Sequence, residues 1–475
     1  NMEKPLIESG CVSCGQCVSV CPTGALQERT TMIKETPVDT VETDTTCSYC
    51  SVGCSLKLES YGDMLIKANP DKLGTVNAGL ACGKGKWGFD CSMLENKLEE
   101  PLIKSGSDFR EADYHEALVL IAKRCQSIGA KYGKDAIGVA VSDRYTNEEA
   151  FAIKKMAETM GAKIFSMNNR ASGIADVLGF DASPNTIDEL LSTNMILAVG
   201  FNTTDNPVIE LKMKQAAEAG AKVVLVNPED YVQHIDFLNK AVYTKNDLSF
   251  LKEVAKAVVD SGRGAGVDGY EEFAASVKDV TVSDDAKAVA DMYLEAKKAM
   301  IVFNQNLITT EAASLLADIA LVSGHIGTPR DGILQVKAKN NSQGLVDLGI
   351  TAGAEELEGV KALVVFGEEA DIDTDALEFL AVSDTHMTAL AAKADVVIPG
   401  TGFASTDGTY TNTERRLQLV QAAIEEDVEL ANWEIAAEIA HVFEVDYEWE
   451  NTEDISVAMN DEVPAYKYAV VDEVL

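Results

Sequence analysis

Beyond residue 100 the chain alternates short apolar runs with longer amphipathic stretches. The apolar runs are rich in Val, Ile and Leu, and they predict strands at 136–142, 195–200, 222–227, 300–304, 362–366, 379–383 and 396–399. Between them, apolar residues that recur about every 3.6 positions predict helices such as 147–160, 208–219 and 310–323. Because the predicted strands are apolar throughout, they are typical of parallel sheets covered by helices on both faces. We therefore predict an α/β chain with doubly wound sheets.

The length and charge of the chain limit its function. Its 475 residues correspond to roughly three domains at about 150 residues each. The 77 acidic residues outnumber the 40 basic ones, and the net charge of −37 argues against a nucleic-acid binder, which needs a basic face. No stretch approaches the roughly 18 apolar residues of a membrane span, and the N-terminus lacks a secretory pattern. We expect a cytoplasmic protein without a membrane span.

Cysteines near the N-terminus form a first motif with metal-binding spacing. Two residues separate Cys11 from Cys14 and Cys14 from Cys17, three separate Cys17 from Cys21, and Pro22 follows. This is the ferredoxin run that holds a 4Fe–4S cluster. Zinc is the alternative, although it favours paired Cys-x2-Cys knuckles. A disulfide framework belongs to small secreted domains and is not expected here.

The fourth cysteine of this motif has two possible roles. In two-cluster ferredoxins the equivalent of Cys21 ligates the other cluster. Either Cys21 completes its own cluster, or a further cluster is shared with an upstream segment or a partner chain. The sequence opens with Asn1 rather than Met, which keeps the upstream segment open.

A second cysteine motif follows. Cys47-x2-Cys50-x3-Cys54 provides three thiolates from one loop, and Cys82 follows after 27 further residues. The spacing predicts a second 4Fe–4S cluster inside a small domain. Cys91 and Cys125 have no such spacing, and Cys125 is expected to be a buried apolar residue on a helix.

The second motif resembles the cluster domain of molybdopterin oxidoreductases. The likeness rests on Cys47-Ser-Tyr-Cys50-Ser-Val-Gly53-Cys54 together with Cys82-Gly-Lys84-Gly. It is greatest for the catalytic subunit of formate dehydrogenases and more distant for the large iron–sulfur subunit of respiratory NADH dehydrogenases. The resemblance extends from Cys11 to about residue 443, and it implies that Lys84 lies between cluster and pterin as an electron relay.

The polar, Thr-rich stretch at 36–46 is typical of a linker, and the resemblance implies that the chain crosses between two α/β domains. The expected parts are a ferredoxin-like segment at 1–34, a cluster domain at 45–100, one α/β domain from 101–165 plus 301–445, an inserted α/β domain at 166–300 and a tail at 446–475.

Several polar loops are similar to segments that flank the pterin dinucleotide in formate dehydrogenases. They are rich in small hydroxyl and amide groups, which can hydrogen-bond a polar heterocycle and a pyrophosphate. A solvated turn is the alternative. The residues concerned are Asn202, Asp205, Asn340, Asn341, Gln343, Thr411, Asn412, Glu414 and Arg415.

Three positions depart from the family pattern where the chemistry occurs. In the segment that contains Arg170, Ser172 occupies the place of the metal-binding cysteine or selenocysteine, so a soft ligand is replaced by an alcohol. Gly173 stands where the active-site histidine would provide a proton acceptor. Lys337 replaces an arginine, so a two-pronged anion clamp becomes a point charge. The chain also continues only briefly past the last predicted helix, so we expect no further domain closing over a pterin.

These departures lead to three hypotheses. The leading one is an iron–sulfur electron-transfer subunit without formate chemistry and without molybdopterin. Its expected partners are a flavin-containing subunit that oxidises NAD(P)H, other iron–sulfur subunits, and ferredoxin. The alternatives are an active molybdenum or tungsten bis-pterin enzyme with Ser172 as ligand and a separate subunit completing the site, and a scaffold that its clusters stabilise. The tail at 461–468 either docks a neighbouring subunit or packs on its own chain.

Overall fold

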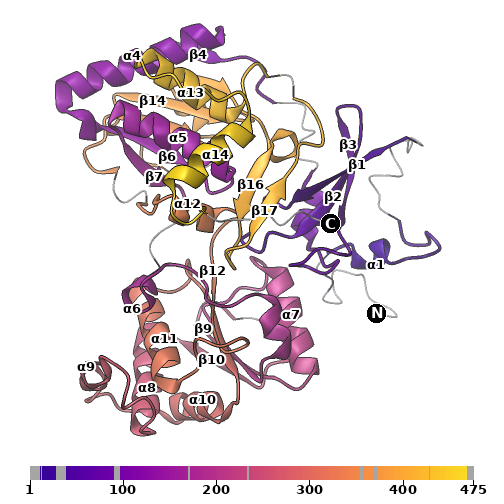
Figure 1. The fold of residues 1–475 in the computed structure, drawn as a ribbon, viewed down its shortest axis with the longest axis vertical. Helices are drawn as coiled ribbons and strands as arrows, with labels where there is room; N and C mark the ends of the chain where they lie inside the picture. Colours follow the sequence, from indigo (N-terminus) through magenta and orange to yellow (C-terminus); the bar gives the residue numbers. More distant parts are fainter. Residues whose placement is uncertain are drawn as a thin grey trace.

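The computed structural model describes residues 11, 13–27, 39–89, 97–168, 172–232, 235–353, 357–367, 372–426 and 428–467. Within this part, two helix-covered sheets lie one above the other in Figure 1, and a small three-stranded sheet lies beside them. No helix among the described residues is long and apolar enough to cross a lipid bilayer. The observed fold is therefore mixed α/β with doubly wound sheets, as predicted from the sequence.

The larger sheet has seven strands, and five of them are mutually parallel. Its order is β5 (Asp108–Glu111), β4 (Leu102–Ser105), β15 (Val396–Pro399), β14 (Phe379–Asp384), β13 (Ala362–Phe366), β6 (Ile137–Val141) and β7 (Lys163–Ser166). Successive residues alternate between two cores, so Val364 packs under the helices of one face and Val365 belongs to the other. The first face is covered by α4 (Tyr114–Tyr132), α5 (Asn147–Met160), α13 (Asn432–Val442) and α14 (Thr452–Glu462). Cys125 on α4 is fully buried there, as expected.

The second sheet has five parallel strands. Its order is β10 (Lys240–Thr244), β9 (Lys222–Pro228), β8 (Met195–Val199), β11 (Ala299–Asn304) and β12 (Gly332–Val336). One face carries α8 (Asp247–Asp260), α10 (Asp284–Glu295) and α11 (Thr310–Ser323), and the other carries α7 (Pro207–Glu218). The short helices α6 (Ala175–Leu178) and α9 (Tyr270–Ser276) flank this part.

All seven predicted strands and the three predicted helices are present, within two residues at each end. The pairing nevertheless differs from the expected division at one point. The sequence analysis assigned residues 301–336 to the first α/β domain, whereas β11 and β12 pair with β8 in the five-stranded sheet. The apolar pattern of β11 and β12 is equally suited to either sheet. Only their hydrogen-bonded pairing with neighbouring strands shows to which sheet they belong.

A small antiparallel sheet carries the cysteine motifs. It consists of β1 (Val41–Thr46), β2 (Ser55–Tyr61) and β3 (Met64–Pro70), with α1 (Gln16–Ser19) and α3 (Gly83–Trp87) beside it. The stretch expected to be a linker therefore becomes a strand from Val41, because its residues pair with β2. The hairpin of β16 (Gly408–Thr411) and β17 (Leu417–Val420) reaches this sheet from the larger α/β part, and Thr46 Oγ1 donates to Leu419 O at 2.8 Å.

The segment after residue 446 packs on its own chain as far as the structure describes it. Ile455 and Met459 of α14 are buried against the core of the larger sheet. The hydroxyl of buried Tyr466 lies 2.8 Å from Thr411 Oγ1 and donates to Asn147 Oδ1 at 3.1 Å. Up to residue 467 this segment is thus part of the fold, and Tyr468 lies outside the described residues.

Candidate functional site

The four cysteines of the second motif line one cavity. Cys47 and Cys54 are buried, and Cys50 and Cys82 are half-buried. Exposed Lys84 lines the same cavity, as expected for a residue beside a cluster. Four sulfur donors from two chain segments around one cavity are the ligand set of a cubane cluster. The residues present therefore fit a 4Fe–4S cluster, which would give this site one-electron chemistry.

The loop that presents three of these thiols is held at both ends. Cys47 N donates to Cys54 O at 2.8 Å and closes the loop. The β16–β17 hairpin then binds the backbone of residues 51–53: Asn412 Nδ2 donates to Val52 O at 3.0 Å, and Gln418 Nε2 donates to Gly53 O at 2.7 Å. Rigid ligands need such support from a surrounding shell of hydrogen bonds.

Burial sets the protonation of these thiols. Desolvation raises the pKa of Cys50 to about 11, and it raises the pKa of Cys47 and of Cys54 further. The neighbouring thiols add to the effect through charge repulsion. Cluster assembly in this cavity must therefore displace protons, as metal binding to thiols generally does.

The first motif lies at the surface beside α3. Cys11 and Cys17 are exposed, whereas Cys14 and Cys21 are half-buried. Backbone N–H groups, that of Leu26 foremost, lower the pKa of the Cys21 thiol to about 7. Four thiols within residues 11–21 again fit the ligand set of a cluster.

The expected metal-ligand position is occupied by a buried polar network. Ser172 Oγ donates to Asp181 Oδ1 at 2.7 Å, and Ser172 N donates to Asp181 Oδ2 at 3.1 Å. Lys337, which is 1% exposed, forms an ion pair with Asp181 Oδ1 at 3.1 Å and donates to Gln305 Oε1 at 3.3 Å.

The charges of this network neutralise each other. Burial opposes ionisation of Asp181, yet the nearby Lys337 ammonium and the hydrogen bonds from Ser172 lower the pKa of this carboxyl below its ordinary value. Burial lowers the pKa of Lys337. In this structure the Ser172 hydroxyl therefore donates to a carboxylate that the Lys337 ammonium neutralises.

Gly173 has no room for a side chain. A Cβ atom at this position would overlap the carbonyl oxygen of Thr310 and would lie 2.7 Å from Ser314 Oγ, and the backbone φ of +89° disfavours any other residue. Ser314 Oγ also donates to Gly173 O at 2.7 Å. A side chain at position 173 would therefore collide with the first turns of α11.

The other residues expected around a pterin are mostly bound to one another or to nearby backbone. Asn341 Oδ1 accepts from Thr411 N at 2.7 Å, and Asn202 Nδ2 donates to Tyr231 OH at 2.7 Å. Three others hydrogen-bond the backbone: Gln343 donates to Asp181 O, Asn340 donates to Arg144 O, and Glu414 accepts from Ile187 N. Arg415 lies in the turn between β16 and β17, and Asp205 lines the cavity of the second cysteine motif. Arg170 lies outside the described residues.

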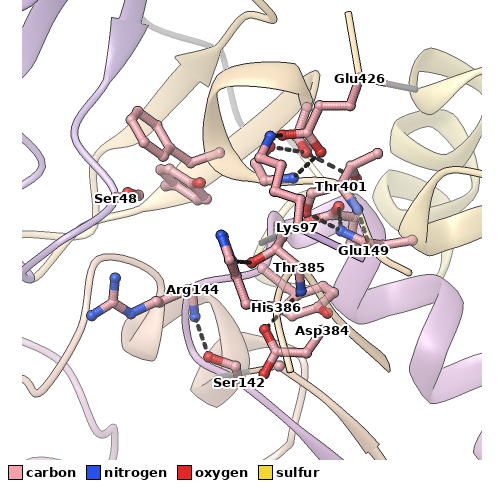
Figure 2. Close-up of a pocket in the computed structure, with 18 residues that line it drawn as sticks. Ser48, Lys97, Ser142, Arg144, Glu149, Asp384, Thr385, His386, Thr401 and Glu426 are labelled. Carbon is pink, nitrogen blue, oxygen red and sulfur yellow. Dashed lines mark hydrogen bonds and ion pairs between the residues drawn. The ribbon is translucent and has the colours of Figure 1, made fainter. Parts of the chain in front are cut away.

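A larger cavity of about 240 Å³ opens elsewhere, beyond the carboxyl ends of β6, β13, β14 and β15. Figure 2 shows its walls, with the ion pair of Lys97 and Glu426 (2.5 Å) towards one side and Asp384 and Ser142 towards the other. Buried Glu149 also lines it, and desolvation raises the pKa of this carboxyl to about 7. Among the described residues, none of those expected around a pterin lines this cavity.

Sequence reasoning missed these cavity residues although the signal was present. Ligands of open α/β sheets bind beyond the carboxyl ends of strands. The predicted strands at 379–383 and 396–399 are followed directly by Asp384-Thr385-His386 and by Gly400-Thr401-Gly402, and both runs line the cavity. Lys97 and Glu426 lie 329 residues apart, and no local pattern brings them together.

Protein-family models match both the α/β part of the chain and its two cysteine motifs. The molybdopterin oxidoreductase model matches residues 97–442, which is well over half of the chain. The chain belongs to the molybdopterin oxidoreductase family. The Fe4S4 domain model of the same family matches residues 40–91, and a 4Fe–4S binding domain model matches residues 5–27. Both cysteine motifs of this family member therefore lie within matched iron–sulfur domains.

The individual relatives that the chain matches include proteins named as oxidoreductases. A probable oxidoreductase of Bacillus subtilis is 25% identical over 95% of the chain, and a putative formate dehydrogenase of Staphylococcus aureus is 26% identical over 95%. The chain spans 58% of the length of each of these relatives. Among solved structures, acetylene hydratase from Pelobacter acetylenicus aligns with a TM-score of 0.67 at 13% identity, over 87% of this chain and 71% of that one. That likeness shows that the two chains share a fold.

Proposed function

We propose that this chain is an iron–sulfur electron-transfer component of an oxidoreductase complex and carries out no formate chemistry itself. The observation that carries the proposal is the network of Ser172, Asp181 and Lys337. The Ser172 hydroxyl already donates its proton to the Asp181 carboxylate, and the buried Lys337 ammonium neutralises that carboxylate. This arrangement favours the neutral hydroxyl over the alkoxide that would bind a metal. The filled space at Gly173 supports the same view, because the position of the family's proton acceptor is closed.

The arrangement of the cysteine motifs supports electron transfer as the remaining role. Trp87 of α3 donates its indole N–H to Ser13 O at 2.7 Å, so the first motif rests on the helix whose N-cap residue is Cys82 of the second motif. Two adjacent cluster sites can pass single electrons in either direction. The potentials then depend on burial and on hydrogen bonds to sulfur.

The proposed partners follow from the electron count. A nicotinamide delivers two electrons as hydride, whereas an iron–sulfur cluster accepts one at a time. A flavin-containing subunit that oxidises NAD(P)H supplies the conversion, and further iron–sulfur proteins such as ferredoxin accept or donate single electrons. The chain would then lie between the two.

Metal analysis of anaerobically purified protein tests this function. We expect about eight irons per chain and no molybdenum or tungsten, since two 4Fe–4S clusters account for all the metal. In the assembled complex, Ser172→Ala should leave the rate of NADH-dependent cluster reduction unchanged. Stoichiometric molybdenum or tungsten, or loss of turnover in Ser172→Ala, would contradict the proposal.

A second candidate function is a pterin-bearing oxidoreductase with Ser172 as metal ligand. It is favoured by three buried amide oxygens, those of Gln335, Asn340 and Gln343, which accept no hydrogen bond from the described residues. A pterin ring could donate to such oxygens. Acid oxidation of the purified chain would then release a fluorescent pterin, two per metal ion for a bis-pterin centre, whereas the leading proposal predicts none.

A further inference from the structure

Helix α3 faces the second cysteine motif on one side. Its N-cap residue is Cys82, and Lys86 N donates to Cys82 O at 3.0 Å in the first turn. Gly85 packs so closely on the cavity that a Cβ atom there would lie 3.4 Å from Cys47 Sγ. The short helix is therefore part of the wall of the cluster cavity.

The opposite side of α3 carries the first cysteine motif. Trp87 Nε1 donates to Ser13 O at 2.7 Å, directly before Cys14. Gly15 lies against the same side chains, because a Cβ atom there would be 2.9 Å from Lys86 Cγ and 2.9 Å from Trp87 Cζ2. Only a residue without a side chain allows the loop this close to the helix.

Further hydrogen bonds hold the first cysteine loop and α3 in place. Gln16 Nε2 donates to Gly79 O at 3.1 Å and so ties α1 to the segment before Cys82. Lys86 is 1% exposed, and its ammonium donates to Asn69 Oδ1 on β3 at 2.8 Å. Tyr49 OH donates to Gly88 O at 2.9 Å and holds the end of the helix.

The environment of Trp87 differs from that of the other tryptophans. Trp433 and Trp449 pack against the large apolar core, and Trp449 stacks on Tyr447 with 4.4 Å between ring centroids. Trp87 instead joins the backbone of one cysteine loop to the helix that presents a ligand of the other.

We propose that Trp87 is a positioning residue that holds the first cysteine loop on α3 and so fixes the separation of the two clusters. This rests on the proposed function in that both motifs hold clusters. This position supports the transfer of one electron from a reduced cluster to an oxidised cluster. No covalent bond forms or breaks in this step, and no proton is transferred. Trp87 acts through the loop and α3, and no redox change of its indole is involved.

Electron paramagnetic resonance of the full chain, purified anaerobically and reduced with dithionite, tests the proposal. Two reduced clusters held close together should show magnetic interaction in the wild type. Trp87→Ala should abolish this interaction while iron stays at about eight per chain. Trp87→Phe, which keeps apolar packing but loses the N–H donor, should weaken it less. Trp449→Ala is the control and should retain the interaction.

A matched pair of glycine substitutions tests the same contact from the loop side. Gly15 and Gly24 both have positive φ, +71° and +65°, but a Cβ atom at Gly24 meets nothing nearer than Gln27 Nε2 at 3.5 Å. Gly15→Ala should abolish the magnetic interaction and Gly24→Ala should retain it, although backbone strain is similar in both.

The outcomes separate this proposal from the proposed function. Undiminished interaction in Trp87→Ala and Gly15→Ala with full iron content would overturn the positioning role and leave electron transfer standing. Molybdenum or tungsten in the wild type would overturn the proposed function, whatever the variants show.

Discussion

Gly173 shows how packing restricts a single position to glycine. The carbonyl oxygen of Thr310 and the hydroxyl of Ser314 fill the volume that any side chain would need. A larger side chain there would require α11 to move. The packing around position 173 and its positive φ therefore both favour glycine.

Gly173→Ala should therefore destabilise the chain far more than an ordinary glycine substitution. The matched control is Gly179→Ala, which shares a positive φ of +80° but meets no atom within 4 Å. Gly179→Ala should cost about 1 kcal/mol of unfolding free energy for the backbone alone, and Gly173→Ala several-fold more. Chemical unfolding measures both. Equal losses would show that the space at Gly173 is not closed.

Glu149 predicts a pH dependence of stability. It is 2% exposed and accepts from Thr146 N and from Asn432 Nδ2, each at 2.7 Å, yet desolvation raises its pKa to about 7 from 4.5. The folded state therefore holds this proton more tightly than the unfolded state does. The contribution to stability is full below the unfolded pKa and is lost as the pH rises towards 7.

Unfolding free energies of the wild type and Glu149→Gln, compared at pH about 5.5 and about 8, test this sign. The wild type should lose stability relative to the variant between the two conditions, on the order of 1 kcal/mol per pH unit. A difference that stays constant, or that grows in favour of the wild type at high pH, would refute the assignment to Glu149.

At the scale of secondary-structure elements, the β16–β17 hairpin joins the small cluster sheet to the larger α/β part. Asn412 and Gln418 bind the backbone of the cysteine loop, and β17 lies next to β1. The amide of Asn412, which the sequence placed beside a pterin, donates to Val52 O. The hairpin therefore supports the cluster site.

Helix α14 provides a test of how firmly the C-terminal segment belongs to the fold. Ile455 is fully buried, whereas Val457 on the same helix is 63% exposed. Ile455→Ala should cost about 2–5 kcal/mol of unfolding free energy, and Val457→Ala should cost almost nothing. Thermal unfolding of both variants checks this. A small effect of Ile455→Ala would mean that α14 detaches without loss of the core.

At the scale of the whole molecule, the two α/β sheets have separate apolar cores. One core of the five-stranded sheet draws its residues from positions 174–333, and the main core of the seven-stranded sheet combines residues 103–164 with residues beyond 345. Parts with their own cores generally unfold as separate units.

Calorimetry should therefore resolve more than one unfolding transition. Leu251→Ala, in the core of the five-stranded sheet, should lower the temperature of one transition, and Ile455→Ala should lower that of another. Equal shifts of a single transition in both variants would show that the two sheets unfold as one unit.

The sequence predicted the strands and helices well where the pattern was strong and local. The observed strands β6 and β8 within the runs at 136–142 and 195–200 contain no polar side chain, and both lie inside their sheets. It missed β10, which is only partly buried, because its pattern is weak. It also placed β11 in the wrong sheet, since apolar character does not specify a pairing partner.

For the candidate site too, the sequence predicted the local features and missed the long-range contacts. Cysteine spacing, which is a local property, indicated both cluster motifs. Lys337 was identified only as a lost anion clamp, and its ion pair with Asp181 joins positions 156 residues apart. The cavity walls at Asp384 and Glu426 likewise meet only in the folded chain.

By itself, the sequence determined the spacing of the two cysteine motifs, the α/β class and the residue types at the altered positions. These follow from short-range spacing and periodicity along the chain. The tertiary structure decided which strands pair, that the Ser172 hydroxyl is held by Asp181, and that Trp87 holds one cysteine loop against the other. Those contacts depend on close approach between distant segments, which only the packed chain specifies.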